Sequence, residues 1–287
     1  MPEKVFLNDR LVDAERAHVP VTDSGFLYGA GLFETMRSHN GVVFRLEDHL
    51  DRLLLSAAGL SINHACDKTR LTKAVYDVLR ANELAESRLR LTLTNGPVSE
   101  TAEEPNPTLL ITARQLQLYP TEYYERGVRV VLCPYRQNTP EPICGHKTTN
   151  YYPRLLALTL ARRQGAAEAL WFTQDNRLAE GSVSNVFLVK DSVLLTPAVE
   201  TPVLPGIARK TICEIAEREE IELTEKDLTI DDLLEADEVF LTNVIMEVLP
   251  VVRVEKHQVG NGRCGALTKR LRELFLGTLE QQCRSEE

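Results

Sequence analysis

Two kinds of hydrophobic pattern alternate along this chain of 287 residues without a regular order. Residues 87–97, SRLRLTLTNGP, alternate leucine with arginine and threonine, which predicts a half-buried strand ending in an Asn95-Gly96 turn. Residues 46–59, 71–81 and 152–163 instead show the spacing of amphipathic helices. Because helices and strands mix without a repeating βαβ unit, the sequence predicts an α+β fold rather than a doubly wound parallel sheet.

The pattern changes near residue 120, where one strand ends and GVRVVLCPYR begins another. We therefore predict a small N-terminal α+β domain over residues 1–120 and a larger C-terminal domain over residues 121–287. Between two strands of the first domain, the polar segment 97–107 is rich in proline and glutamate, and we expect this loop to be mobile.

Charge and cysteine usage exclude several classes of protein. The net charge of −9 argues against a nucleic-acid or anionic-membrane surface, since both need clustered lysine and arginine. No apolar run has the length of a membrane span, and the charged start does not resemble a signal peptide, so we expect a cytoplasmic protein. The six cysteines form no CxxC pair and stand at no metal-ligand spacing, which predicts reduced thiols and no metal site.

Four features carry candidate chemistry. Lys147 lies in GHKTTNYY before a helix, where a dry pocket would lower its pKa and favour Schiff-base chemistry. In LPGIARK, a Pro-Gly turn leads into a helix whose first amides, at Ile207 and Ala208, can bind an anion. Glu180 in EGSVSN could hold the proton of a pyridine nitrogen, and Arg52 in HLDRL could hold a phosphate. Taken singly, each has an ordinary explanation as a surface charge or a plain turn.

Together the four features are the parts that bind pyridoxal 5'-phosphate: an amine, an anion cradle, an arginine and an acid. Over nearly its whole length the chain resembles the class IV, fold-type IV aminotransferases that use this cofactor. The order and spacing of the matching segments also fit this family. These segments are YGAGLFETMR (28–37), FRLEDHLDRL (44–53), KTTNYY (147–152), EGSVSNVFLV (180–189), LPGIARKTI (204–212) and VGNGRCGALTKRL (259–271).

The resemblance implies a two-domain enzyme whose larger C-terminal domain is an α/β pseudo-barrel carrying the cofactor lysine. Lys147 would hold the cofactor covalently and move a proton during catalysis, and Glu180 would pair with the ring nitrogen. The other cofactor-binding residues that the resemblance implies are Arg52, Tyr151, Leu204, Ile207, Ala208, Asn243 and Val244. The family often has a threonine where Val244 stands, so backbone amides or Asn243 would have to serve there.

The first and last matching segments resemble branched-chain aminotransferases most closely. That subgroup implies substrate contacts at Tyr28, Phe33, Arg37, Arg90 and Ile245, although Arg90 could equally be a solvent-facing residue of an alternating strand. We therefore expect a ping-pong transfer of an amino group between a small or branched L-amino acid and a 2-oxo acid. The family completes its pocket with a partner subunit, which implies at least a homodimer.

Other activities stay open at this point. Residues 242–251, TNVIMEVLPV, look more like aminodeoxychorismate lyases, which eliminate pyruvate with the same cofactor. D-amino-acid aminotransferases usually carry an arginine where Asn95 stands, which counts against D-specificity unless Arg88 or Arg90 replaces it. A non-enzymatic scaffold is disfavoured because the lysine, acid and arginine are all present. A nicotinamide site fails because Glu34 occupies the third glycine position of GxGxxG.

Overall fold

The computed structural model describes residues 3–62, 67–98 and 106–284. The chain packs as two compact units. Unit 1 comprises Met1–Gln117, His146–Tyr151 and Leu279–Glu287, and unit 2 comprises Leu118–Gly145 and Tyr152–Thr278. Most of the loop that we expect to be mobile, residues 99–105, lies outside the described residues.

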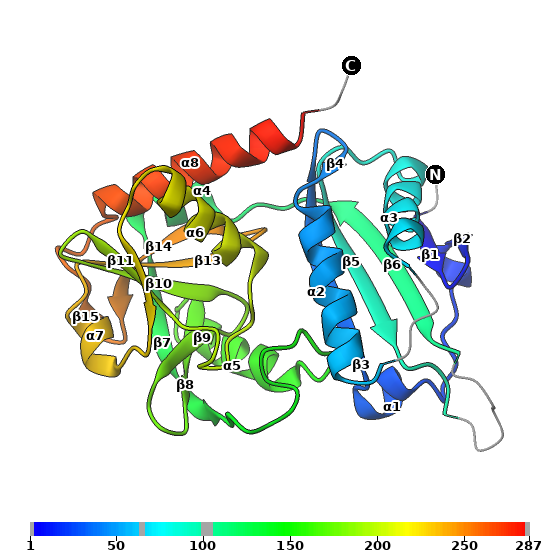
Figure 1. Cartoon of the computed structure of the whole chain (residues 1–287), viewed down its shortest axis with the longest axis horizontal. Helices are drawn as coiled ribbons and strands as arrows, with labels where there is room; N and C mark the ends of the chain where they lie inside the picture. The colour runs from blue at the N-terminus through cyan, green and yellow to red at the C-terminus, as the bar shows by residue number, and fades with distance from the viewer. Residues whose placement is uncertain (1–2, 63–66, 99–105, 285–287) are drawn as a thin grey trace. The chain divides into compact units, whose positions relative to one another are not determined.

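Unit 1 is built on an antiparallel sheet with the strand order β2-β1-β6-β5-β3-β4 (Figure 1). The strands are β1 (Lys4–Leu7), β2 (Arg10–Asp13), β3 (Gly31–His39), β4 (Val42–Val43), β5 (Ser87–Thr94) and β6 (Thr108–Gln115). In β5 the predicted alternation is confirmed, because Leu89, Leu91 and Leu93 are buried whereas Arg88 and Arg90 are exposed.

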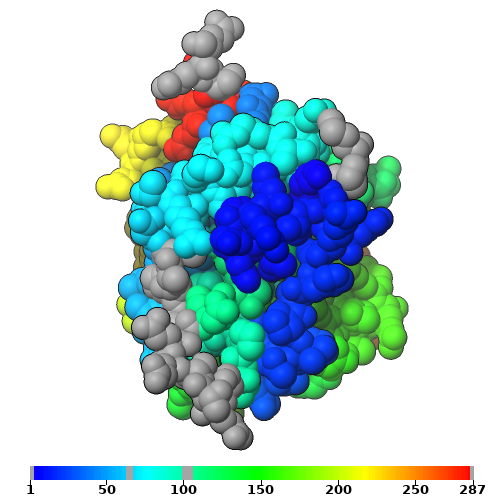
Figure 2. Space-filling model, turned by 90° about the vertical axis from the view of Figure 1, so that its right-hand side faces the viewer, coloured from blue at the N-terminus to red at the C-terminus, as the bar shows by residue number. Residues whose placement is uncertain are grey.

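Two helices cover one face of this sheet, α2 (Leu46–Gly59) and α3 (Lys68–Ala81). Their apolar stripes, for example Leu50 and Leu53 of α2, pack with the leucines of β5 in one core cluster. Figure 2 shows the N-terminal hairpin (blue) lying beside α3 (cyan). Shorter helical segments are η1 (Ala14–Arg16) and α1 (Ser24–Tyr28).

Residues 146–151 belong to unit 1, although the sequence division assigned them to the C-terminal domain. Their backbone pairs with β3, and an isolated antiparallel bridge joins Leu32 to Thr148. A segment between two elements of unit 2 is thereby bound to the sheet of unit 1. No local hydrophobic pattern indicates such a pairing in advance.

Unit 2 contains a nine-stranded mixed sheet ordered β12-β11-β10-β13-β14-β7-β8-β9, with β15 paired to β14. Because β9 also contacts β10 and β11, the sheet curls back toward its other end. Its strands are β7 (Val128–Gln137), β8 (Glu168–Thr173), β9 (Leu178–Gly181), β10 (Asn185–Lys190), β11 (Val193–Pro197), β12 (Leu223–Lys226), β13 (Glu238–Asn243), β14 (Glu247–Val254) and β15 (His257–Gln258).

Helices pack around this second sheet (Figure 1). They are α4 (Thr121–Arg126), α5 (Tyr152–Arg163), α6 (Ile207–Arg218), α7 (Ile230–Leu234) and α8 (Ala266–Gln282). The predicted α+β class is confirmed, and the helix predicted over residues 152–163 has the bounds of α5. Among the described residues, no helix is long and apolar enough to cross a membrane.

Candidate active site

Lys147 lies in an extended segment that pairs with the edge of β3. The Phe33 N–H donates to the Lys147 carbonyl at 2.8 Å, and the Thr149 N–H donates to the Gly31 carbonyl at 2.8 Å. Gly31 permits this approach, because a Cβ there would lie 2.8 Å from the Leu93 carbonyl oxygen and 3.0 Å from Thr149 Oγ1. Strand pairing therefore fixes the backbone of the lysine.

The amine of Lys147 lies over the ring of Phe33, a buried residue of β3. Lys147 Nζ is 4.7 Å from the Phe33 ring centroid and 5.7 Å from that of Tyr151. The rings of Phe33 and Tyr151 meet edge to face, with centroids 5.1 Å apart. The Arg90 guanidinium lies 3.9 Å from the same Phe33 centroid. One aromatic ring thus contacts two cations, and such a place favours an anionic ligand.

Arg90 shares one face of the sheet with two other residues assigned to the substrate, Phe33 and Arg37. Arg90 pairs with Thr35, and Arg88 pairs with Arg37, so alternation places these side chains on the face opposite α2 and α3. Burial by neighbouring side chains, and then the charge of Arg88, lower the pKa of Arg90. A carboxylate bound there would offset both costs of the charged guanidinium.

The remaining substrate-assigned residues differ in exposure. Arg37 is buried, whereas Tyr28, the last residue of α1, is 71% exposed. Ile245 lies in unit 2, in the turn between β13 and β14, and is buried. Their substrate roles stay predictions.

Arg52 is held by a buried carboxylate that the sequence analysis did not assign to the site. Glu34 of β3 accepts from Arg52 Nε at 2.8 Å and from Arg52 Nη2 at 2.5 Å. His49, one turn earlier on α2, lies with Nδ1 2.7 Å from the same carboxylate. Glu34 and His49 are each 1% exposed. Arg52 therefore enters any phosphate contact already oriented by a bidentate ion pair.

The protonation states of this trio follow from burial and charge. Burial alone would raise the pKa of Glu34, but the charge of Arg52 and the hydrogen bond from His49 outweigh it and bring the pKa to about 2. Burial lowers the pKa of His49, with Glu34 opposing that shift. At neutral pH the trio thus comprises a carboxylate, a guanidinium and a neutral imidazole that donates its Nδ1–H to Glu34.

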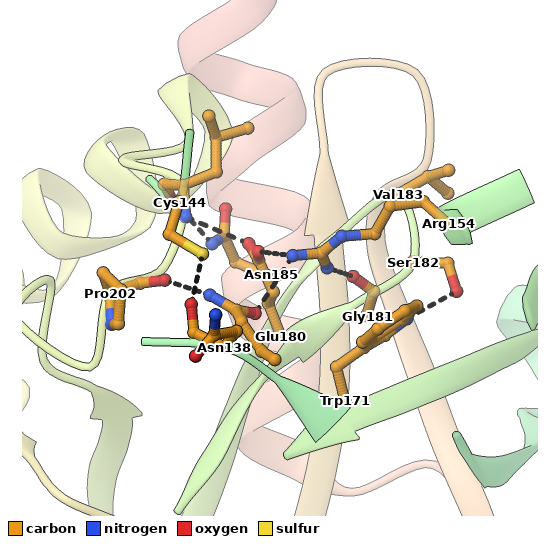
Figure 3. Close-up of polar contacts among 12 residues, drawn as sticks. Asn138, Cys144, Arg154, Trp171, Glu180, Gly181, Ser182, Val183, Asn185 and Pro202 are labelled. Atoms are coloured by element: carbon orange, nitrogen blue, oxygen red, sulfur yellow. Dashed lines mark hydrogen bonds and ion pairs between the residues drawn. The ribbon is translucent and has the colours of Figure 1, made fainter. Parts of the chain in front are cut away.

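In unit 2, Glu180 occupies β9 and is buried (Figure 3). Its Oε1 accepts from Arg154 Nη2 at 2.7 Å, and its Oε2 accepts from the Leu204 N–H at 3.1 Å. The backbone of Leu204 thus supports the acid, which leaves its half-buried side chain for the cofactor contact assigned to it. Arg154, on α5, was not identified from the sequence.

The turn after Glu180 is built around a second buried acid, Glu168. Glu168 Oε1 accepts from the Ala169 and Ser182 N–H groups at 3.0 and 3.1 Å. Its Oε2 accepts from the Val183 N–H and the Ser184 hydroxyl, both at 3.1 Å. This one carboxylate therefore shapes the EGSVSN turn and, through it, the position of Glu180.

The predicted anion cradle at the start of α6 has the expected geometry. Gly206 precedes Ile207 and Ala208, and no side chain among the described residues caps this helix start. A Cβ on Gly206 would lie 1.9 Å from Asn185 Oδ1, so only glycine fits there. The Ile207 and Ala208 amides belong to the first helical turn, which has no intrahelical acceptors for its N–H groups.

The second phosphate-binding turn that we expected, at Asn243 and Val244, uses the asparagine internally. Asn243 Oδ1 accepts from the Ile245 and Met246 N–H groups at 2.9 and 2.8 Å. Its Nδ2 donates to the Val183 carbonyl at 2.9 Å. Of the two ways to replace the missing threonine, a backbone N–H at Val244 is therefore favoured over the Asn243 side chain.

The sequence could have revealed part of what it missed. His49 lies three residues before Arg52 on α2, so helical spacing alone places both on one face. Glu34 stands in the quoted segment YGAGLFETMR. No sequence signal pairs Arg154 with Glu180, because that contact depends on how α5 packs against the sheet.

This geometry agrees with comparisons to known proteins. Residues 31–254 match the family described as Amino-transferase class IV, and the chain belongs to this family. A Methanocaldococcus jannaschii protein provisionally named branched-chain-amino-acid aminotransferase is 36% identical over 95% of both chains. A D-alanine aminotransferase of Listeria monocytogenes is 30% identical over 98% of this chain and 97% of its own length.

Solved structures show the same fold. The branched-chain amino acid aminotransferase of Escherichia coli superimposes with a TM-score of 0.93 at 31% identity, over 100% of this chain and 97% of that one. A second enzyme of the same name, from the organism abbreviated T.th., was solved with pyridoxamine 5'-phosphate. It gives a TM-score of 0.91 at 27% identity, over 98% of this chain and 95% of that one. The chain is an aminotransferase with the fold-type IV architecture.

The Glu34–His49–Arg52 trio predicts a pH dependence of stability. The pKa values of both Glu34 and His49 lie below their ordinary values, so the unfolded chain binds protons more readily than the folded one in acid. Stability should fall as pH drops below about 6.5 through His49, and again from about 4.5 to 2 through Glu34. The Glu34 contribution amounts to about 3 kcal/mol.

Urea unfolding between pH 7 and pH 3 measures this effect. Glu34→Gln should be less stable at pH 7 and should lose less stability on acidification than the wild type. Glu47→Gln, at an exposed position on the same helix, is the matched control and should keep the wild-type slope. Equal slopes for Glu34→Gln and the wild type would contradict the assignment.

Proposed function

We propose that this enzyme uses pyridoxal 5'-phosphate to move an amino group between a small or branched-chain L-amino acid and a 2-oxo acid. The observation that carries the proposal is the amine of Lys147 held over Phe33 beside the guanidinium of Arg90. An amine for covalent attachment and a cation for a substrate carboxylate thus contact the same ring. The similarity to the Escherichia coli branched-chain enzyme supports this substrate class.

The residues present fit the cofactor. Lys147 would attach it covalently, Glu180 would accept a hydrogen bond from its ring nitrogen, and Tyr151 would contact its phenolic oxygen. Arg52, held by Glu34, and the uncapped start of α6 supply the cation and the amides that a phosphate needs. The glycine that α6 requires at its start is a cradle of the kind that phosphate groups occupy.

The protein's part in the reaction follows from these positions. When bound, the cofactor ring supplies a place for the electrons released as the substrate Cα–H bond breaks. Lys147 Nζ then removes the proton from Cα and returns it on the cofactor side. The ionised Glu180 keeps the ring nitrogen protonated, and Arg90 holds the substrate carboxylate. A 2-oxo acid runs the same steps in reverse, which gives ping-pong kinetics.

A second candidate is a D-amino-acid aminotransferase. The similarity to the Listeria D-alanine enzyme favours it, and Arg88 next to Arg90 offers two guanidinium groups for a carboxylate. Asn95, where that subgroup usually carries an arginine, counts against it.

The amino-donor half-reaction distinguishes these functions. Cofactor-loaded protein is mixed with single L- or D-amino acids, and the absorbance of the bound cofactor and the 2-oxo acid released are followed. We expect turnover with L-leucine, L-valine or L-isoleucine, and at least a roughly 1000-fold loss in Lys147→Ala, because the proton carrier is gone. Lys190→Ala, which removes a lysine bonded to the Glu235 carbonyl, is the control and should react normally.

Reaction only with D-amino acids would replace the first candidate by the second. A cofactor spectrum that stays unchanged with every amino acid would contradict both. Aminodeoxychorismate would then be the next compound to test, with release of pyruvate as the readout.

We also infer that the enzyme works as a homodimer or larger homo-oligomer in the cytoplasm. Apolar side chains at and just before α1 support an interface, since Val21 is 77% and Phe26 is 75% exposed. The five cysteines within the described residues are unpaired thiols, as a reducing compartment would leave them. Light scattering of the purified protein should give at least twice the chain mass of 32.3 kDa. A single species at the chain mass would contradict the oligomer.

A further inference from the structure

We propose that Arg154 is a positioning residue that fixes the carboxylate of Glu180 toward the ring nitrogen of the cofactor. This inference rests on the proposed function, and it adds a residue to which the resemblance assigns no role. Arg154 Nη2 donates to Glu180 Oε1 at 2.7 Å, and the two side chains are only 20% and 8% exposed. Figure 3 shows the guanidinium directed at the acid.

The second oxygen of Glu180 is held from a different element. The Leu204 N–H donates to Oε2 at 3.1 Å, and the Leu204 carbonyl in turn accepts from Asn185 Nδ2 at 2.9 Å. One donor on each oxygen fixes the plane of the carboxylate. A carboxylate offers about four lone-pair sites, so acceptor capacity remains for one further donor such as a ring N–H.

Arg154 is itself held on several sides. Its Nη1 donates to the Gly181 carbonyl at 3.1 Å, and its Nη2 also donates to Gln137 Oε1 at 3.0 Å. The Gln137 Nε2 donates onward to the Pro202 carbonyl. The guanidinium also lies 4.8 Å from the centroid of the Trp171 ring, whose Nε1 donates to Ser182 Oγ at 3.1 Å. Arg154 therefore has one preferred position, set by α5, β7 and β8.

The charge of Arg154 explains why this position needs arginine. A buried carboxylate without a counter-charge is costly, and Glu180 would face that cost whenever the cofactor is absent. Arg154 removes the cost in both states while leaving an acceptor for the ring. Lysine could supply the charge, but its single ammonium lacks the planar fork that reaches Glu180, Gln137 and Gly181 together.

The test compares cofactor binding rather than turnover alone. Wild type, Arg154→Lys, Arg154→Met and Glu180→Gln are loaded with pyridoxal 5'-phosphate carrying 15N in the ring. The 15N chemical shift reports whether the ring nitrogen is protonated, and titration gives the cofactor Kd. Arg162→Met, at an exposed position on the same helix, is the matched control. Thermal melting of each variant separates loss of fold from loss of position.

We expect a protonated ring nitrogen in the wild type and in Arg162→Met. Arg154→Met should move the 15N signal toward that of Glu180→Gln and raise the cofactor Kd roughly 10-fold, the loss of one charge-assisted hydrogen bond. Arg154→Lys should fall between the wild type and Arg154→Met, and it decides the question if Arg154→Met does not fold.

Two results would overturn the inference. A 15N shift and a Kd that both match the wild type in Arg154→Met, or in Arg154→Lys if that variant alone folds, would show that Arg154 only supports the fold. Wild-type protein that takes up no cofactor at all would contradict the proposed function itself, and the inference with it. The wild-type measurement therefore separates the two failures.

Discussion

The backbone pairing between residues 147–149 and β3 is the constraint on which the candidate site depends. Two hydrogen bonds of 2.8 Å attach this segment to the strand that also carries Phe33 and Glu34. Because successive residues of a strand point to opposite faces, Phe33 meets Lys147 and Arg90, whereas Glu34 turns toward α2 and holds Arg52. One strand thereby positions both the amine and the phosphate-binding cation.

Buried carboxylates organise the rest of the site. Glu34 orients Arg52, Glu168 shapes the turn after β9, and Glu180 is held between Arg154 and the Leu204 amide. Each has a full set of donors, which offsets the cost of burying its charge. Such pre-set charges favour a cofactor that needs an acid and a cation in fixed places.

The sequence predicted those elements whose burial is one-sided. In β5 and α5 a polar face alternates with an apolar one, so the hydrophobic period indicates the structure directly. It did not reveal β3 and β14, which are buried on both faces. β3 mixes Glu34 and Arg37 with apolar residues at buried positions, and β14 is a nearly continuous apolar run containing Pro250. Periodicity has no meaning for such strands.

The candidate site divides in the same way. Lys147, Glu180 and Arg52 could be assigned because they stand in segments that resemble a known family. The residues that hold them, Glu34 and Arg154, could not, since those contacts join positions 18 and 26 residues apart through tertiary packing. The account as a whole depends on Lys147 being the residue that attaches the cofactor. Borohydride reduction of the cofactor-loaded protein, followed by peptide mapping, tests this directly. The account predicts a single adduct on the peptide containing Lys147, and an adduct on any other lysine would contradict it.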